Sequence, residues 1–134
     1  MRIIGIDYGQ KRIGLAMSDP LGITSQPLPF LPNDSKIFHT LEKMVRENQV
    51  QEIVVGLPIT MKGTPSEMTT EVEKFASKLQ EFVEIPIFLQ DERLSTMESE
   101  KILISADVSR AKRKEVRDSM SASIILQDYL ERKQ

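Results

Sequence analysis

The chain of 134 residues has no cysteine and a single histidine, His39. Without cysteine there can be no disulfide bond and no metal site built on thiolates, and a reducing cytoplasm is an allowed location. One histidine excludes a zinc site made of several histidines and leaves a Ser-His-Asp hydrolase with one candidate base. Because His39 falls inside a predicted helix, we interpret it as a surface or packing residue.

The sequence also lacks an apolar run long enough to cross a bilayer. Its N-terminus shows neither the apolar stretch nor the small-residue cleavage site of a secretion signal. A length of 134 residues suits one domain with its own hydrophobic core. We therefore expect a cytoplasmic protein in which residues 1–134 form a single domain.

Charge is nearly balanced, with 18 Lys and Arg against 20 Asp and Glu, so the formal net charge is -2. Such a surface repels a polyanion on average, and nucleic-acid binding must come from a local concentration of positive charge. Residues Ser105 to Arg117 lose apolar periodicity and are predicted to form an exposed loop. The basic residues of this segment are candidates for contact with phosphates: Arg110, Lys112, Arg113, Lys114 and Arg117.

The first nineteen residues predict a β-hairpin that carries one carboxylate. A β-branched strand ends on Asp7, Gly9 permits the turn, and a second strand returns over Ile13 to Ser18. Alternation places Asp7 on the same face as Gly5, where the second strand also offers small residues. This shallow face indicates either close helix packing, which we favour, or room for a ligand beside the carboxylate.

Beyond the hairpin, strands alternate with helices, which is typical of an α/β domain. The antiparallel hairpin and the later parallel crossovers predict a mixed central sheet with helices on both faces. The expected elements are an extended edge segment over Ile23–Leu31, a helix capped by Asn33 or Asp34 and ending near Asn48, a strand over Ile53–Leu57, a helix opened by Thr64-Pro65-Ser66-Glu67, a strand over Ile85–Asp91, a helix opened by Ser95–Glu98 and a final helix from about Glu115 to Arg132.

Acidic residues stand at the ends of these elements. Asp7 and the pair Asp91-Glu92 end strands, and Asp118 lies in the first turn of the last predicted helix. Clustered carboxylates without histidine or cysteine favour Mg²⁺ or Mn²⁺, and two such ions can hold the attacking water and the leaving oxygen of a phosphodiester. Each acid also has a structural interpretation: Asp7 as a turn former, Glu92 as a partner of Arg93, and Asp118 as a helix-start acid.

Four stretches in order resemble the YqgF family of pre-16S rRNA nucleases, which are related to Holliday-junction resolvases. The opening motif is GIDYGQKRIGLAMSD over residues 5–19, and the others are residues 54–58 with Gly63, residues 91–96, and Asp118 followed by Ser121-Ala122 and residues 125–130. The resemblance covers essentially the whole chain. One departure is Ser121, where the family usually has alanine.

The resemblance implies a ribonuclease H-like fold and a metal-dependent endonuclease that uses Mg²⁺ or Mn²⁺. It assigns the catalytic and metal-binding roles to Asp7, Glu92 and Asp118, whereas the residues alone leave Asp91 and Glu92 both open. The implied reaction is maturation of the 5′ end of precursor 16S rRNA, with structured RNA as the first partner, branched DNA as the second, and ribosomal particles as a further candidate. Lys11, Arg12 and Arg93 are candidates for contact with phosphates, although surface solvation and salt bridges explain them equally well.

Three other functions stay open from the sequence. A Holliday-junction resolvase would act on branched DNA and would normally work as a symmetric pair, whereas RNA processing is compatible with a monomer or weak homodimer. A non-catalytic nucleic-acid-binding domain could keep the same fold. An ATP-binding module of the actin-like fold opens with a similar hairpin, but it needs two such domains.

Overall fold

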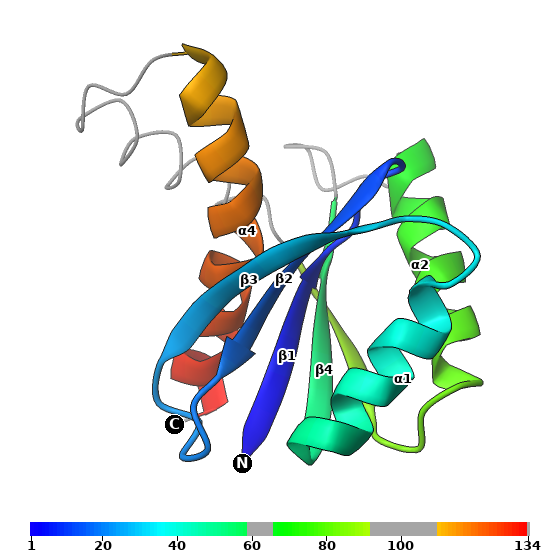
Figure 1. The fold of residues 1–134 in the computed structure, drawn as a ribbon, viewed down its shortest axis with the longest axis vertical. Coiled ribbons are helices and arrows are strands. Elements are labelled where there is room, and N and C mark those ends of the chain that lie inside the picture. Colours follow the sequence, from blue (N-terminus) through cyan, green and yellow to red (C-terminus); the bar gives the residue numbers. More distant parts are fainter. Residues whose placement is uncertain (59–65, 92–109, 134) are drawn as a thin grey trace.

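In a computed structural model of the protein, the described residues are 1–58, 66–91 and 110–133, with side chains in the last range described from residue 121 onward. These ranges form one mixed sheet with helices on both of its faces (Figure 1), which confirms the expected α/β fold. The elements are β1 (Arg2–Asp7), β2 (Arg12–Ser18), β3 (Ser25–Pro32), α1 (Ile37–Asn48), β4 (Val50–Leu57), α2 (Glu67–Gln80), β5 (Ile87–Asp91) and α4 (Arg110–Lys133).

The sheet has the strand order β3-β2-β1-β4-β5, with β1 at its centre. β2 pairs antiparallel with both β1 and β3, whereas β4 pairs parallel with both β1 and β5. β3 is an edge strand, as Pro27 and Pro29 predict, because proline has no N–H to donate to a ladder and is tolerated where that position faces solvent. The carboxyl ends of β1, β4 and β5 therefore meet at one end of the sheet.

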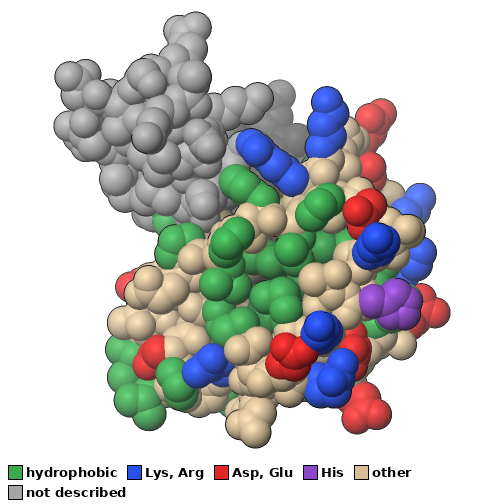
Figure 2. Space-filling view, in the orientation of Figure 1, with side chains coloured by type: hydrophobic (Ala, Val, Ile, Leu, Met, Phe, Trp, Pro, Cys, Tyr) green, Lys and Arg blue, Asp and Glu red, His purple; other side chains and the backbone are tan. Residues whose placement is uncertain are grey.

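Alternating side chains divide the core into two layers. Ile4 and Ile6 of β1 are buried in the layer that α1 and α2 cover, and Ile3 is buried in the layer that α4 covers. This division of β1 between two faces is the one that strand alternation predicts. His39 lies on the exposed side of α1, with its ring edge-on to Phe82 at 5.1 Å, which agrees with a surface or packing role (Figure 2).

Gly5 explains why one face of the hairpin is shallow. A Cβ atom at this position would lie 2.7 Å from the Cβ of Leu126 and 3.0 Å from the carbonyl oxygen of Ala122. Glycine therefore lets the backbone of α4 approach β1 more closely than any other residue would. Of the two interpretations of the shallow face, close helix packing is the one that the structure confirms at Gly5.

The carboxyl-terminal end of α4 is fixed to β4 through Glu52. The Tyr129 hydroxyl donates to Glu52 Oε1 at 2.8 Å, and Lys133 Nζ lies 2.9 Å from both Glu52 oxygens. One turn before Tyr129 in the helix, the carbonyl oxygen of Ile125 accepts a hydrogen bond from Gln90 Nε2 of β5 at 2.9 Å. Because Glu52 lies near the start of β4, α4 runs from the carboxyl ends of the parallel strands towards their amino ends (Figure 1).

Tyr129 should make the fold sensitive to alkaline pH. Burial of the ring and its hydrogen bond to Glu52 raise the pKa of Tyr129 above its ordinary value. Such a group stabilises the fold fully below its unfolded pKa of about 10, and this contribution is lost as the pH rises further. Tyr129→Phe should therefore flatten the fall in unfolding free energy above about pH 10, measured by denaturant titration. An unchanged alkaline slope would contradict this coupling.

The start of α4 differs from the prediction. The final helix was expected to begin near Glu115, after an exposed loop, but it begins at Arg110. Lysine, arginine and alanine are good helix formers, and a helix segment without an apolar stripe gives no periodic signal in the sequence. The absence of periodicity over residues 110–117 therefore indicates no continuous apolar face, and it was wrong to conclude that there was no helix.

The predicted N-caps of two helices are also wrong. The N-cap of α1 is Lys36 and not Asn33 or Asp34, because Asp34 Oδ1 accepts from the Lys36 amide at 2.9 Å in a turn that precedes the helix. The N-cap of α2 is Ser66, whose hydroxyl exchanges capping-box hydrogen bonds with Thr69. Thr64 was expected to cap α2, but the cap lies two residues later, at Ser66. The helix expected after Ser95 lies outside the described residues. Within the described ranges, no helix is long and apolar enough to span a membrane.

Candidate active site

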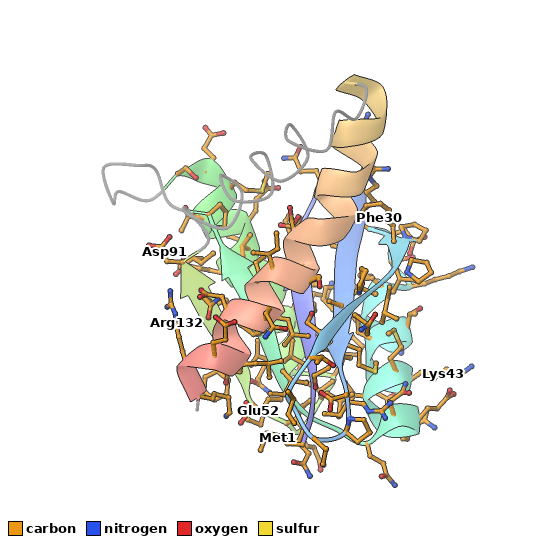
Figure 3. The ribbon with its side chains drawn as sticks, turned by 90° about the vertical axis from the view of Figure 1, so that its left-hand side faces the viewer. Met1, Phe30, Lys43, Glu52, Asp91 and Arg132 are labelled. Atoms are coloured by element: carbon orange, nitrogen blue, oxygen red, sulfur yellow. The ribbon has the colours of Figure 1, made fainter. Side chains whose placement is uncertain are left out.

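Asp7 ends the central strand at the point where the parallel strands also end. Its partner in the β1–β2 register is Gly14, which has no side chain to cover the carboxylate. On the other side of β1, Ile6 pairs with Val55 of β4 in parallel register. One strand further, Asp91 of β5 pairs with Leu57 of β4. Asp91 and Phe30 lie at this end of the sheet, and Glu52 and Met1 lie at the opposite end (Figure 3). Asp7 itself is half-buried.

A hollow of about 190 Å³ opens at Asp7 and is bordered by two cationic residues. The Arg12 guanidinium is held over the Phe30 ring, with its central carbon 4.4 Å from the ring centre. The residues that line the hollow are Asp7, Tyr8, Gly9, Lys11, Arg12, Gly14 and Phe30. The structure thus brings two of the predicted phosphate-binding residues, Lys11 and Arg12, beside the predicted carboxylate. A carboxylate next to two cations suits a ligand that combines a phosphate with a metal ion.

The hairpin turn that carries these cations is held by Asn33. Asn33 Nδ2 donates to the Gly9 carbonyl at 2.8 Å, and its backbone amide donates to the Lys11 carbonyl at 3.0 Å. A Cβ atom on Gly9 would overlap the Arg12 carbonyl oxygen, so the turn requires glycine. Sequence reasoning missed this role because it assigned Asn33 to a helix cap. The sequence carried one signal for this role: Asn33 directly follows a strand, and the residue after it is not part of the apolar pattern of a helix.

Asn33→Ala should lower activity at this site more than it lowers stability. Loss of one side-chain hydrogen bond costs about 1 kcal/mol of unfolding free energy, whereas a displaced turn can cost about tenfold in cleavage rate. Asn48→Ala is the matched control, because Asn48 Nδ2 donates to the Met44 carbonyl at 3.0 Å in α1. We expect similar melting curves for the two variants and slower cleavage of labelled RNA for Asn33→Ala alone. Equal cleavage rates would show that the turn does not position the site.

The other two predicted acids are described only in part. Glu92 lies outside the described residues, as does Arg93, and for Asp118 the structure describes the helical backbone. Position 118 is one turn before Ala122, which packs on Gly5. The four residues from Ala122 back to position 118 rise about 6 Å along the helix, and the two residues from Gly5 to Asp7 rise about 6.6 Å along the strand. Position 118 therefore lies level with Asp7. No group of three metal-ligating side chains occurs among the residues described.

Asp91 lies on the wrong face of the sheet to join Asp7. Its neighbour Gln90 is buried against α4, and Ile87 packs against the layer under α1 and α2. Alternation along β5 therefore assigns Asp91 to the α1–α2 face, whereas Asp7 shares the α4 face with Gly5. This placement argues against Asp91 as a partner of Asp7.

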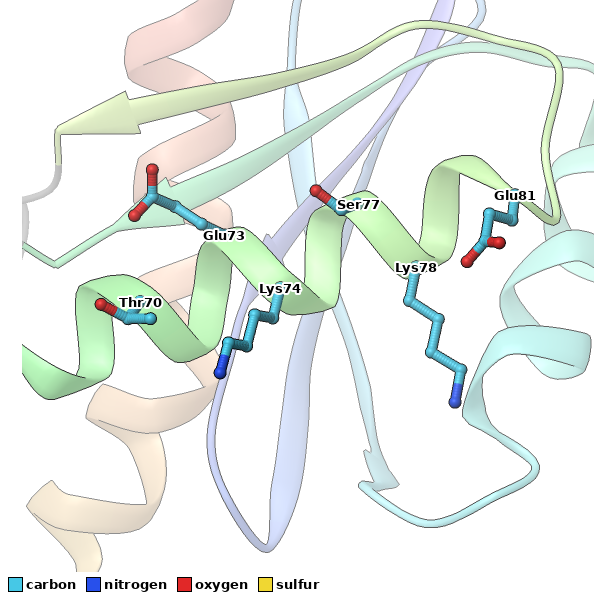
Figure 4. Close-up of a pocket in the computed structure, with 6 residues that line it drawn as sticks. All are labelled: Thr70, Glu73, Lys74, Ser77, Lys78 and Glu81. Carbon is cyan, nitrogen blue, oxygen red and sulfur yellow. The ribbon is translucent and has the colours of Figure 1, made fainter.

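A larger hollow, of about 460 Å³, runs along the outer side of α2 (Figure 4). All of its lining residues come from this one helix and the residue after it: Thr70, Glu73, Lys74, Ser77, Lys78 and Glu81. It contains no strand end, and acidic and basic side chains alternate along it. Such a row of mixed charges is typical of a solvated helix face. The hollow at Asp7 is therefore the candidate active site.

Two solved structures share this arrangement of strands and helices. "T. thermophilus RuvC in complex with Holliday junction substrate" superposes with a TM-score of 0.60 at 12% identity, covering 99% of this chain and 96% of that chain. The fowlpox virus Holliday junction resolvase superposes with a TM-score of 0.56 at 13% identity, covering 98% and 99%. The protein therefore has the ribonuclease H-like fold of these resolvases.

Sequence comparison then defines the family. Residues 1–132 match RuvX, described as Holliday junction resolvase, and the chain belongs to this family. A protein of Desulforamulus reducens is 47% identical over 133 residues, covering 98% of this chain and 97% of its own length. A Bacillus cereus protein is 44% identical over 137 residues, covering 99% and 100%. Both are named "Putative pre-16S rRNA nuclease", which confirms the resemblance seen in the sequence.

Proposed function

We propose that this protein is a metal-dependent endonuclease that hydrolyses phosphodiester bonds in structured nucleic acid. The observation that carries the proposal is the position of Asp7, at the end of the central strand and in one hollow with Lys11 and Arg12. Carboxylates at the ends of parallel strands are suitably placed for ligands in α/β sheets. The residues 1–134 would act as one nuclease domain.

The metal ligands in this proposal are Asp7, Glu92 and Asp118. The donor set fits a hard cation, because the chain has no cysteine and its one histidine lies on α1, outside the hollow. Carboxylate oxygens are the ligands that Mg²⁺ and Mn²⁺ prefer. A bound ion would supply charge for the attacking water and the leaving oxygen. Lys11 and Arg12 would hold the phosphate and offset its charge beside Asp7.

Precursor 16S rRNA is the substrate that we favour, with maturation of its 5′ end as the reaction. Relatives that are 43–47% identical over nearly the full chain carry the rRNA nuclease name, whereas the compared junction resolvases share 12–13% identity. We further propose that the protein acts in the cytoplasm on ribosomal particles, as a monomer or weak homodimer. Cleavage of branched DNA, which would need a symmetric pair, is the second candidate, and its support is the family description.

A cleavage assay separates these functions. The purified protein is incubated with a labelled RNA that spans the 5′ end of 16S rRNA, and in parallel with a four-way DNA junction, in Mg²⁺, Mn²⁺ or EDTA. We expect the RNA to be cut when either metal is present and to stay intact in EDTA. Paired cuts in the junction alone would favour the resolvase. Binding of both substrates without cleavage would indicate a non-catalytic domain.

The basic residues at the start of α4 should contribute affinity without contributing to catalysis. Replacing Arg110, Lys112 and Arg113 together by glutamine should weaken RNA binding and reduce its dependence on log salt by about one unit per lost phosphate contact. Lys43→Gln on the exposed side of α1 is the control, because it removes charge far from the strand ends. Binding is measured by fluorescence anisotropy at several salt concentrations. An unchanged slope would remove this segment from the binding surface.

A further inference from the structure

A second hollow adjoins the candidate active site, on the other side of Tyr8. Its volume is about 280 Å³, and it is lined by Tyr8, Asn33, Phe38, Glu71, Lys74, Phe75 and Lys78. We call it the Tyr8 groove. Tyr8 also lines the hollow that contains Asp7, so this residue borders both spaces. The two hollows are therefore neighbouring compartments at one end of the sheet.

Aromatic rings form the inner wall of the Tyr8 groove. The ring centres of Tyr8 and Phe75 are 5.0 Å apart, and those of Phe38 and Phe75 are 5.5 Å apart. Phe75 is buried, whereas Tyr8 and Phe38 keep part of their surface exposed. Packing against Phe75 fixes the Tyr8 ring, so it offers a rigid apolar face at small entropic cost.

Positive charge lies on the rim of the groove. Lys74 and Lys78 are exposed on α2, one helical turn apart, and Lys78 Nζ is 5.0 Å from the centre of the Phe38 ring. The acidic residue of the rim, Glu71, accepts a hydrogen bond from Gln10 Nε2 at 2.9 Å. A planar apolar wall with two ammonium groups beside it combines the two features that bind single-stranded nucleic acid: a stacking surface and phosphate contacts.

The position of Tyr8 relates the groove to the reaction. Asp7 and Tyr8 are consecutive, and Tyr8 packs towards the layer under α1 and α2 while Asp7 shares the α4 face with Gly5. A nucleic-acid strand with one phosphate at Asp7 therefore meets Tyr8 when it continues towards α2. A base inside a duplex has both of its faces covered by its neighbours, so this ring favours an unpaired base, whose face is open.

We propose that the Tyr8 groove binds an unpaired nucleotide next to the scissile phosphate. Its base stacks on Tyr8, and its phosphate contacts Lys74 and Lys78. This inference rests on the proposed nuclease function and makes it more specific, because it defines the substrate as nucleic acid with a single-stranded segment beside the cut. A fully paired end lacks the nucleotide that fills the groove.

The test compares two RNA hairpins that differ only in a single-stranded tail, with 2-aminopurine at the first unpaired position. Binding is measured with Asp7→Asn protein, which removes the charge needed for cleavage. We expect the tailed RNA to bind about five- to a hundredfold more tightly than the blunt one. Stacking on Tyr8 should also quench the fluorescence of 2-aminopurine. Equal affinity for the two RNAs, or unchanged fluorescence on binding, would overturn the proposal.

Variants assign the effect to the groove. The double variant Lys74→Gln, Lys78→Gln should lose most of the preference for the tail and keep the parental affinity for the blunt RNA. Tyr8→Leu should also lose most of this preference. Tyr8→Phe keeps the ring and should keep the preference, and Lys43→Gln controls for removal of a helix-surface charge. The lysine variant changes exposed residues, so it keeps the test decisive if Tyr8→Leu unfolds. Equal losses on tailed and blunt RNA would contradict a nucleotide site.

Cleavage by the parental protein distinguishes this inference from the proposed nuclease function on which it rests. Metal-dependent cutting of blunt and tailed RNA at equal rates supports the nuclease and overturns the groove. A preference for the tail in binding, without cleavage of any RNA, supports the groove and overturns the nuclease.

Discussion

Asp7→Asn should abolish cleavage and leave the fold intact. Asparagine keeps the shape of the side chain but removes the charge that, in our proposal, binds the metal ions at the end of β1. Loss of one electrostatic stabiliser of this kind typically costs at least about a hundredfold in rate. Without metal, the variant should be as stable as the parent or more so, because repulsion among Asp7, Glu92 and Asp118 is relieved. Calorimetric metal titration and cleavage assays in Mg²⁺ and Mn²⁺ measure both effects.

Asp19→Asn is the matched control for this experiment. The Asp19 carboxylate accepts backbone hydrogen bonds from Ile23 at 2.7 Å and Thr24 at 2.8 Å, in the turn at the far end of β2 from Asp7. Its replacement should alter this turn and spare cleavage. Parental cleavage by Asp7→Asn would disprove the catalytic assignment. Unfolding of Asp7→Asn would instead identify Asp7 as a structural turn residue.

Gly5→Ala should reduce both stability and activity, because α4 must move away from β1 to admit one methyl group. The added Cβ atom would overlap Leu126, which is fully buried and cannot turn aside. Overpacking of this kind costs about 1–3 kcal/mol of unfolding free energy. The displacement also moves position 118 relative to Asp7, and the cleavage rate should fall by about tenfold or more. Denaturant titration and cleavage assays below the melting temperature test the two effects.

Val54→Ala separates displacement of α4 from simple loss of stability. Val54 is fully buried on the same face of the sheet, and its truncation leaves a cavity without pushing the helix. At matched fractions of folded protein, we expect Val54→Ala to cleave faster than Gly5→Ala. Equal rates would show that the approach of α4 at Gly5 does not control the site, and a fully stable Gly5→Ala would contradict the overlap itself.

The hairpin and its two faces could be predicted because the information for them is local. A period of two over Arg2–Asp7 determines which side chains share a face, and Pro27 and Pro29 restrict their strand to an edge. The start of α4 could not be predicted in the same way, since residues 110–117 have helix-forming side chains without an apolar stripe. Helix caps were missed because Asn33 and Asp34 have local alternatives that a sequence does not distinguish.

The candidate site was predictable only where a single element creates it. Asp7 follows from its place at the end of a buried strand, and Lys11 and Arg12 follow from the adjoining turn. The hydrogen bond from Asn33 to Gly9 and the contact between Gln10 and Glu71 join segments that are 24 and 61 residues apart. Such pairs depend on tertiary packing and leave no periodic signal. The roles of Glu92 and Asp118 stay predictions that rest on the family resemblance.

The prolines of β3 also affect how molecules of this protein meet one another. An edge strand with free amide groups is a template on which a second chain can add a strand, which is the first step of domain swapping and fibril growth. Exposed Pro27 and Pro29 lack those amide groups along β3. Sheets of two molecules therefore cannot join continuously through this edge, and β3 disfavours edge-to-edge association on its side of the sheet.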